Sequence, residues 1–242
     1  IYENENNTEI EEFGCLEHDT IHFLAASPDG INVDPKSKKY GRLLEIKNPV
    51  SRVIKGIPKK EYWVQMQLQM AVAKLYICDF LETQFKEYEN EEQFLADGTY
   101  LRTVDNKRKG IIICFNDGNG PVYKYPPLDL CKEDCENWID KQIEDNPNFS
   151  WINNSYWKLD VYSCITVRFN KESFEKAIPI FSNTWDNILT HRKNGYNHLK
   201  PNSRKKKIKK QPPTLLQQLQ QSIIKIRTES FDNTNINENS SN

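Results

Sequence analysis

The sequence lacks any apolar run long enough to cross a bilayer: residues 111–115 are typical of its longest runs, and they have the length of a strand. Mean hydropathy is -0.76, which also speaks against a membrane protein. The sequence does not open with a basic segment followed by an apolar one, which is the pattern of a secretory signal. We therefore expect an intracellular protein rather than a secreted one.

Paired CxxC motifs are absent, although the chain has six cysteines. A zinc site can be drawn from Cys15, His18, His22, Cys131 and Cys135, but only its short spacings fit. The cysteines are scattered, and several lie in apolar runs. This pattern is typical of reduced, buried thiols and not of a disulfide framework.

Positive charge is missing from the start of the chain, where no Lys or Arg precedes Lys36. The totals nearly balance, with 33 Lys and Arg against 34 Asp and Glu, but the distribution is uneven. A dense cationic run near the end consists of Arg204, Lys205, Lys206, Lys207, Lys209 and Lys210. Such asymmetry can mean a polyanion partner for the basic run and a cation site near the acidic start, although charge blocks of this kind are more often only solvated tails. The alternative is a solvated acidic surface followed by a solubilising tail.

The pattern along the chain predicts one α/β domain over residues 1–200 and a basic, partly disordered tail over residues 201–242. A hydrophobic content of 37% suffices for a core. Residues 27–30 form a turn signature, and residues 31–33 and 42–47 read as the strands of a hairpin. We expect further strands at residues 110–115 and 160–169, and helices at residues 61–80, 130–143 and 171–194, the last with an internal Pro179.

The strand at residues 43–47 carries the clearest chemical signal. Side chains alternate faces along a strand, so Glu45 and Lys47 point one way while Leu44 and Ile46 point the other. Asp29 lies in the preceding turn, from which a hairpin can bring its carboxylate close to Glu45. Two convergent carboxylates repel unless a cation lies between them, and Mg²⁺ is a common solution. Read alone, the triplet is weak evidence and is more typical of an exposed, ion-paired strand face.

Three motifs in order give this pattern a context: residues 23–30 (FLAASPDG), 43–49 (LLEIKNP) and 62–67 (YWVQMQ). Together they resemble the core of the phage lambda exonuclease / YqaJ-like viral recombinase family, a branch of the PD-(D/E)xK nucleases. Residues 162–169 and the following helix look like that family's last strand and closing helix. The resemblance implies a restriction-endonuclease-like α/β core, with a mixed β-sheet flanked by helices.

The resemblance also implies a role for each matching residue. Asp29 and Glu45 would be the principal metal ligands, with the backbone carbonyl of Ile46 as a third, and Lys47 would orient the attacking water. Gln65 would support the site from its helix, although a merely polar helix face is an equal reading of Gln65 and a stronger one of Gln67 and Gln69. Two further implied positions are Asp19, as an extra acid, and Tyr62, near the DNA.

The implied activity is Mg²⁺- or Mn²⁺-dependent hydrolysis of DNA, in the family's manner a 5′→3′ exonuclease on duplex ends that serves viral recombination or repair. Endonuclease activity and a degenerate, inactive DNA-binding core are alternatives, and a structural or interaction protein is a third. The expected location is the cytoplasm or nucleus of a host, or a virion. Expected partners are duplex DNA, other copies of the chain and a single-strand annealing protein. The DNA-contacting cations would be the basic run near the end together with Lys36, Lys38, Lys39 and Arg42.

Two departures from the family accompany the resemblance. Asn48 stands where members usually have Cys, at a position that carries no chemistry. The family places a further metal-site glutamate and a 5′-phosphate-binding basic residue on an N-terminal helix, and this chain is expected to begin at about the end of that helix.

Overall fold

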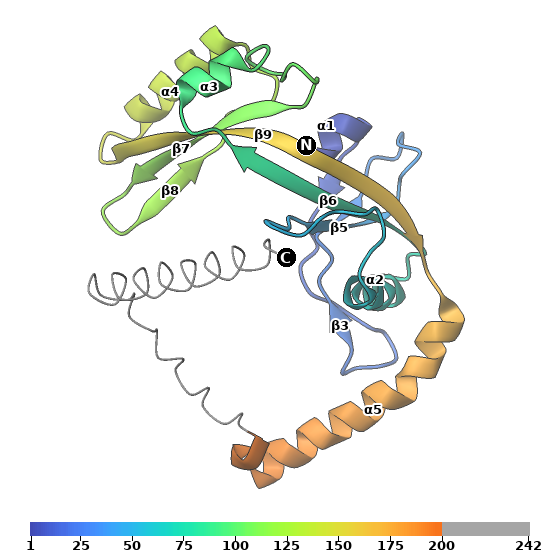
Figure 1. The fold of residues 1–242 in the computed structure, drawn as a ribbon. Coiled ribbons are helices and arrows are strands. Elements are labelled where there is room, and N and C mark those ends of the chain that lie inside the picture. The colour runs from blue at the N-terminus through green and yellow to red at the C-terminus, as the bar shows by residue number, and fades with distance from the viewer. Residues whose placement is uncertain (200–242) are drawn as a thin grey trace, which may run out of the picture. The chain divides into compact units, whose positions relative to one another are not determined.

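The computed structural model describes residues 1–199, in which a seven-stranded mixed sheet forms the centre (Figure 1). The strand order is β1 (Ile10–Glu11), β4 (Gly30–Asn32), β5 (Leu43–Lys47), β6 (Ile77–Glu87), β9 (Ser150–Arg168), β7 (Lys109–Asn116) and β8 (Pro121–Lys124). A small second sheet pairs β2 (Leu16–Glu17) with β3 (Ala25–Ala26). The helices are α1 (Tyr2–Asn6), α2 (Lys60–Ala73), α3 (Glu91–Ala96), α4 (Lys132–Asp145), α5 (Lys171–Asn194) and a short 3₁₀ turn at Asn197–Leu199. The predicted α/β class, with a mixed sheet flanked by helices, is confirmed.

The chain forms two compact units. The first, Ile1–Ile188, contains both sheets, and the second begins at Leu189. The predicted domain boundary between residues 200 and 201 falls outside the described residues and stays a prediction. Within residues 1–199 no helix combines the length and the apolarity that a membrane crossing needs. All six cysteines are free, and Cys131 accepts the backbone N–H of Asp134 at the start of α4.

The core of the sheet is a hairpin followed by a crossover. β4 and β5 pair antiparallel, as the sequence predicts, and α2 then carries the chain across to β6, which runs parallel to β5. The helix predicted over residues 61–80 is wrong in its second half. α2 ends at Ala73, because Lys74 adopts the left-handed conformation at φ 55° and its N–H turns back to the last carbonyls of the helix. The following residues belong to β6, where Cys78 and Phe80 are buried as strand residues.

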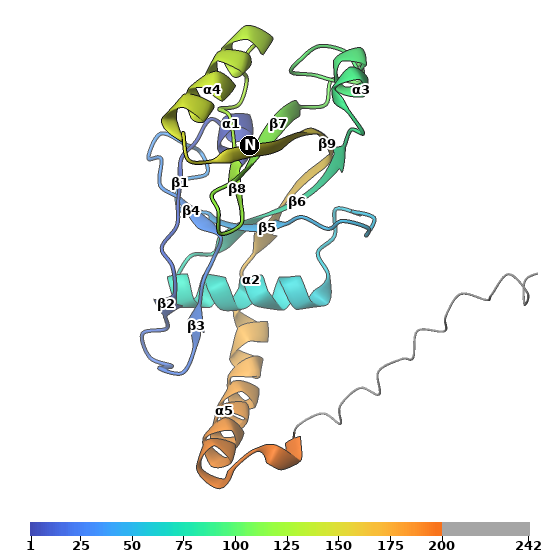
Figure 2. The same ribbon diagram turned by 90° about the vertical axis from the view of Figure 1, so that its left-hand side faces the viewer.

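Helices α2 and α1 lie on opposite faces of β5 and β6 (Figure 2), and each face has its own core. On one face α2 covers the sheet, and Met66 and Met70 pack against Leu43 and Phe80. On the other face Tyr2 of α1 packs against Leu44 and Leu81. Because paired residues on neighbouring strands share a face, Glu45 and Lys47 lie on the α2 side with Phe80 and Glu82.

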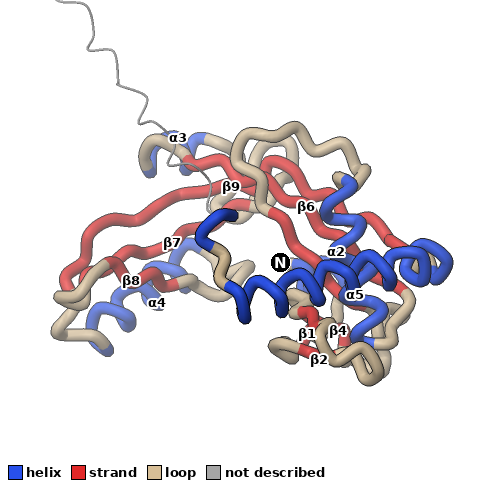
Figure 3. The backbone as a smooth tube through the Cα atoms, turned by 90° about the horizontal axis from the view of Figure 1, so that it is seen from below, coloured by secondary structure: helices blue, strands red, loops and turns tan. Residues whose placement is uncertain are grey.

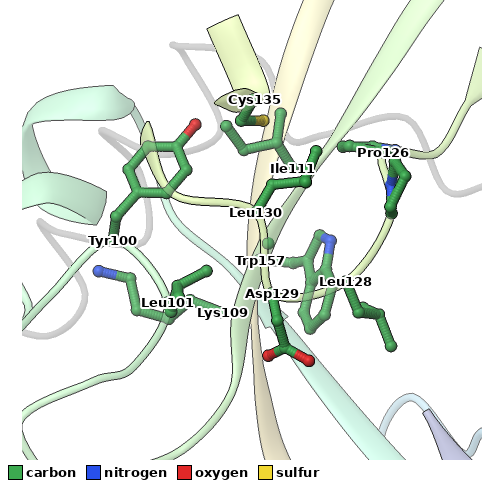
Figure 4. Close-up of a pocket in the computed structure, with 12 residues that line it drawn as sticks. Tyr100, Leu101, Lys109, Ile111, Pro126, Leu128, Asp129, Leu130, Cys135 and Trp157 are labelled. Atoms are coloured by element: carbon green, nitrogen blue, oxygen red, sulfur yellow. The ribbon is translucent and has the colours of Figure 1, made fainter. Parts of the chain in front are cut away.

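β9 joins the two halves of the sheet, since its first half pairs with β7 and its second half with β6 (Figure 3). In the β7 half, α3 and α4 enclose a separate small core built around Phe94 and Cys135. A cavity of about 30 Å³ remains between Tyr100, Ile111, Cys135 and Trp157 (Figure 4). That volume suits one or two water molecules and is far below the roughly 300–1,000 Å³ of a ligand pocket.

A buried carboxylate, Asp79 on β6, fastens α1 and the hairpin turn to the sheet. Asp79 Oδ2 accepts from the Tyr2 hydroxyl at 2.7 Å and from Lys39 Nζ at 2.7 Å, and Oδ1 accepts from Arg42 at 3.0 Å and from Thr166 at 3.1 Å. Burial alone would raise the pKa of Asp79, but the hydrogen bonds from Lys39, Tyr2 and Arg42 outweigh it and lower that pKa. The carboxylate is thus saturated, and its role is structural.

We predict that Tyr2→Phe lowers the free energy of unfolding by about 1–2 kcal/mol, because Asp79 loses one charge-assisted hydrogen bond inside the protein. The melting temperature should fall by about 3–6 °C in differential scanning calorimetry. Tyr40→Phe is the matched control, since the Tyr40 side chain is exposed. Equal effects of the two substitutions would show that the Tyr2–Asp79 contact does not stabilise the fold.

Candidate active site

Asp29, Glu45 and Lys47 lie at the same end of the β4–β5 hairpin. The hairpin register pairs Gly30 with Leu44, so the next position along it sets Asp29 opposite Glu45. There the strands separate, and Asp29 Oδ2 accepts the backbone N–H of Ile46 at 2.6 Å. Gly30 is required at this point because a Cβ would overlap the side chain of Ile10 on β1. The turn signature therefore places an exposed carboxylate beside the strand that carries Glu45 and Lys47.

Glu45 is completely buried, yet both of its carboxylate oxygens have donors. Oε1 accepts from Lys47 Nζ and from Gln65 Nε2, the latter at 2.7 Å. Oε2 accepts from Gln69 Nε2, also at 2.7 Å. A buried carboxylate is tolerated only with such partners, and the ammonium of Lys47 supplies the compensating charge.

The glutamines of α2 divide into two roles. Gln65 and Gln69 are four residues apart on the helix, so they share the face that meets Glu45, and Gln69 also donates to the Ser27 carbonyl at 3.3 Å. Gln67 points elsewhere: it donates to the Arg168 carbonyl and accepts the N–H of Asn170. The sequence analysis predicts the same role, a polar helix face, for Gln67 and Gln69. The signal that distinguishes Gln69 is its spacing of four residues from Gln65.

The donor set at this position suits a hard divalent cation. Asp29 has one carboxylate oxygen, Oδ1, beyond the one that holds Ile46, and Glu45 supplies a second carboxylate. A strand residue directs its N–H and C=O to the same edge, so the Ile46 carbonyl faces the Asp29 side of β5. Carboxylate and carbonyl oxygens are the ligands that Mg²⁺ and Mn²⁺ prefer. Within residues 1–199 no three acidic, His or Cys side chains converge on one point.

Several predicted site residues lie away from this cluster. Asp19 is ion-paired with Lys74 at 2.6 Å, and this hydrogen bond lowers the pKa of the exposed Asp19 carboxyl. Lys39 and Arg42 bind Asp79 on the opposite face of the sheet from Glu45. Lys36 and Lys38 are exposed in the turn between β4 and β5. The six cations from Arg204 to Lys210 lie outside the described residues.

Tyr62, by contrast, lies next to Lys47, a contact that the sequence did not predict, and its expected place near the DNA stays a prediction. Tyr62 is on the first turn of α2, and Lys47 Nζ lies 5.3 Å from the centre of its ring. An ammonium over an aromatic face is attracted by the negative face of the ring. Tyr62 therefore holds Lys47 from one side while Glu45 holds it from the other.

Residues 1–76 match the family model of the YqaJ-like viral recombinase domain. This stretch contains Asp29, Glu45, Lys47 and both supporting glutamines, and the match confirms the resemblance inferred from the three motifs. An uncharacterized protein of Acanthamoeba polyphaga mimivirus is 35% identical over 79% of this chain and 41% of its own length. The chain thus spans about two fifths of that relative.

Two solved structures are similar over part of the chain. The crystal structure of an alkaline exonuclease from Laribacter hongkongensis has a TM-score of 0.31 and 22% identity, over 60% of this chain and 59% of that chain. The complex of the exonuclease LHK-Exo with dAMP has a TM-score of 0.30 and 23% identity, over 60% of this chain and 58% of that chain.

We predict that Lys47→Met lowers the free energy of unfolding by about 2–4 kcal/mol, because it leaves the buried Glu45 carboxylate without its compensating charge. In a Glu45→Gln background the same change should cost less than about 1 kcal/mol, since no buried charge remains. Urea denaturation measures both values. Lys38→Met, on an exposed side chain, is the control, and additive effects of the two site substitutions would contradict the buried ion pair.

Proposed function

We propose that the protein is a metal-dependent nuclease that hydrolyses DNA phosphodiester bonds. The observation that carries the proposal is that the Glu45–Lys47 ion pair and Asp29, which accepts the N–H of Ile46, lie at the same end of the β4–β5 hairpin. Two carboxylates and an ammonium at one point match the needs of phosphodiester hydrolysis, in which a water attacks while negative charge develops on the phosphate. The family match over residues 1–76 independently favours a protein that acts on DNA.

Asp29 and Glu45 would hold Mg²⁺ or Mn²⁺, with the Ile46 carbonyl as a third ligand. When bound, the ion would supply Lewis-acid activation of water and charge stabilisation on the phosphate. Lys47 has the reach to contact a phosphate oxygen or to orient the attacking water, because its side chain remains partly accessible while Glu45 is buried. Gln65 and Gln69 hold the Glu45 carboxylate in place. Tyr62 limits the positions open to the Lys47 ammonium.

The finer proposal is a 5′→3′ exonuclease that acts at duplex ends in viral DNA recombination or repair, with Mg²⁺ or Mn²⁺ as cofactor. The three linked motifs support it. Assembly with further copies of the chain and with a single-strand annealing protein belongs to the same proposal. The alternative function is a DNA-binding recombination module without cleavage. It is favoured by one observation, that protein donors already occupy both oxygens of Glu45.

We predict that the protein degrades linear duplex DNA with Mg²⁺ or Mn²⁺ and that EDTA abolishes the cleavage. Glu45→Gln and Lys47→Met should each slow it by at least about 100-fold, because each removes a group that touches the ion or the phosphate. Glu92→Gln and Lys141→Met, on exposed helical residues, are the controls. Labelling either the 5′ or the 3′ end gives the polarity from the order in which label is released. DNA binding without cleavage by the wild-type protein would favour the alternative.

We predict a Mn²⁺ site that can be measured without DNA. Titration followed by electron paramagnetic resonance should show Mn²⁺ binding that Asp29→Asn weakens at least about tenfold, since a direct carboxylate ligand is lost. Mn²⁺ should also raise the melting temperature of the wild-type protein, because it binds the folded state. Asp140→Asn in α4 is the control. Equal Mn²⁺ affinity in both variants would exclude Asp29 as a ligand.

A further inference from the structure

Glu82 on β6 is a second buried carboxylate beside the candidate active site. It is the cross-strand partner of Lys47, so it lies on the same face of the sheet, and it is 1% exposed. One oxygen, Oε1, accepts from the Arg52 guanidinium. The other, Oε2, is buried without a hydrogen-bond partner among the described residues. An unsatisfied buried carboxylate oxygen is costly, so a purely stabilising role does not explain Glu82.

Arg52 belongs to the loop of residues 48–59 between β5 and α2, and this loop is fastened along β6. Asn48 accepts from the Thr83 hydroxyl, and Gln84 donates to the Val50 carbonyl at 3.0 Å. Together with the ion pair between Arg52 and Glu82, these contacts attach the loop to three consecutive residues of β6, from Glu82 to Gln84. The loop is therefore held in one position next to Lys47.

The result is a group of three cations around one aromatic ring. Lys47 Nζ, Arg52 Cζ and Lys59 Nζ lie 5.3, 5.9 and 5.8 Å from the ring centre of Tyr62. Glu45 and Glu82 each neutralise one of them, and Lys59 has only the exposed Glu61 at 3.7 Å as an acidic partner among the described residues. The side chains of Lys47, Arg52 and Lys59 nevertheless stay 25%, 24% and 45% exposed, so each keeps a part that an anion can reach from solvent.

We infer that Glu82 is a positioning residue, which holds Arg52 over Tyr62 so that Arg52, with Lys59, binds a DNA phosphate next to the one at Lys47. The inference rests on the proposed function, because it needs DNA at Lys47. A planar guanidinium is well suited to phosphate oxygens, and its Glu82 partner keeps it in place before DNA arrives. Glu82 is not assigned as a metal ligand, because it lies on the β6 side of β5 whereas Asp29 lies on the β4 side.

DNA binding in EDTA tests this inference without cleavage, through the fluorescence anisotropy of a short labelled duplex. Arg52→Met should weaken binding about tenfold at moderate salt. It should also reduce the slope of log K against log salt by about 0.7–0.9, the value for one lost phosphate contact. Arg52→Lys should restore the slope, because it keeps the charge. Lys141→Met should leave both values unchanged. A structural role alone would move the melting temperature but not the slope.

The role of Glu82 is tested by a double-mutant cycle. Glu82→Gln should weaken DNA binding several-fold in the wild-type background and by less than about twofold in the Arg52→Met background, because it acts through Arg52. In steady-state cleavage it should raise KM more than it lowers kcat. Glu87→Gln, on the exposed end of the same strand, is the matched control.

Three results would overturn the inference: an unchanged salt slope in Arg52→Met, equal effects of Glu82→Gln in both backgrounds, or weaker Mn²⁺ binding by Glu82→Gln, which would make Glu82 a metal ligand. If the wild-type protein does not bind DNA at all, the proposed function fails with it. If the wild-type protein binds and cleaves DNA while the Arg52 and Glu82 variants behave like it, only the inference fails.

Discussion

The burial of the Glu45 carboxylate is the constraint on which the rest of the site depends. Removing a carboxylate from water costs several kcal/mol unless charge and hydrogen bonds replace the solvent. At Glu45 the replacement comes from two elements, Lys47 of the same strand and two glutamines one helical turn apart on α2. These donors reach Glu45 only when α2 crosses β5 in one register. The packing of Met66 and Met70 on Leu43 and Phe80 secures that register, so the hydrophobic core positions the donors of Glu45.

Three buried carboxylates occupy the two central strands, and their partners distinguish their roles. Asp79 has four donors and faces the α1 side, away from the site, so Lys39 and Arg42 are committed to the fold. Glu45 also has a full set of donors, but one of them is the partly accessible Lys47. Glu82 alone keeps an unpartnered oxygen. Whether a lysine or arginine of the loops is available for DNA therefore depends on its bonding partner and on the face of the sheet where it lies. Its position in a basic stretch of sequence does not decide this.

Features of the fold that depend only on residues close together in the chain can be predicted from the sequence. The hairpin, the alternation of Glu45 and Lys47 on β5 and the extent of α5 follow from turn residues and periodicity, and the structure confirms them. The prediction from sequence extends α2 into β6, because Ile77 continues the helical spacing and nothing in the residue type of Lys74 signals a left-handed conformation. The sequence does not reveal the partner of Lys39 and Arg42, because Asp79 lies 40 and 37 residues away from them and meets them only in the folded sheet. The pairing of Arg52 with Glu82 is hidden in the sequence for the same reason, since 30 residues separate them.

The family similarity and the burial of the site come from different parts of the chain. Residues 1–76 contain both carboxylates, the lysine and the two glutamines, and this is the stretch that matches the family model. The strand that lies beside Glu45 and Lys47 begins only at Ile77, and β9 covers its far edge. A hairpin and a helix alone would leave one edge of β5 in water, where the Glu45–Lys47 pair would have little strength because solvent screens exposed charges. The residues of the candidate site are therefore encoded locally, whereas their electrostatic environment is produced by strands that the matching stretch does not contain.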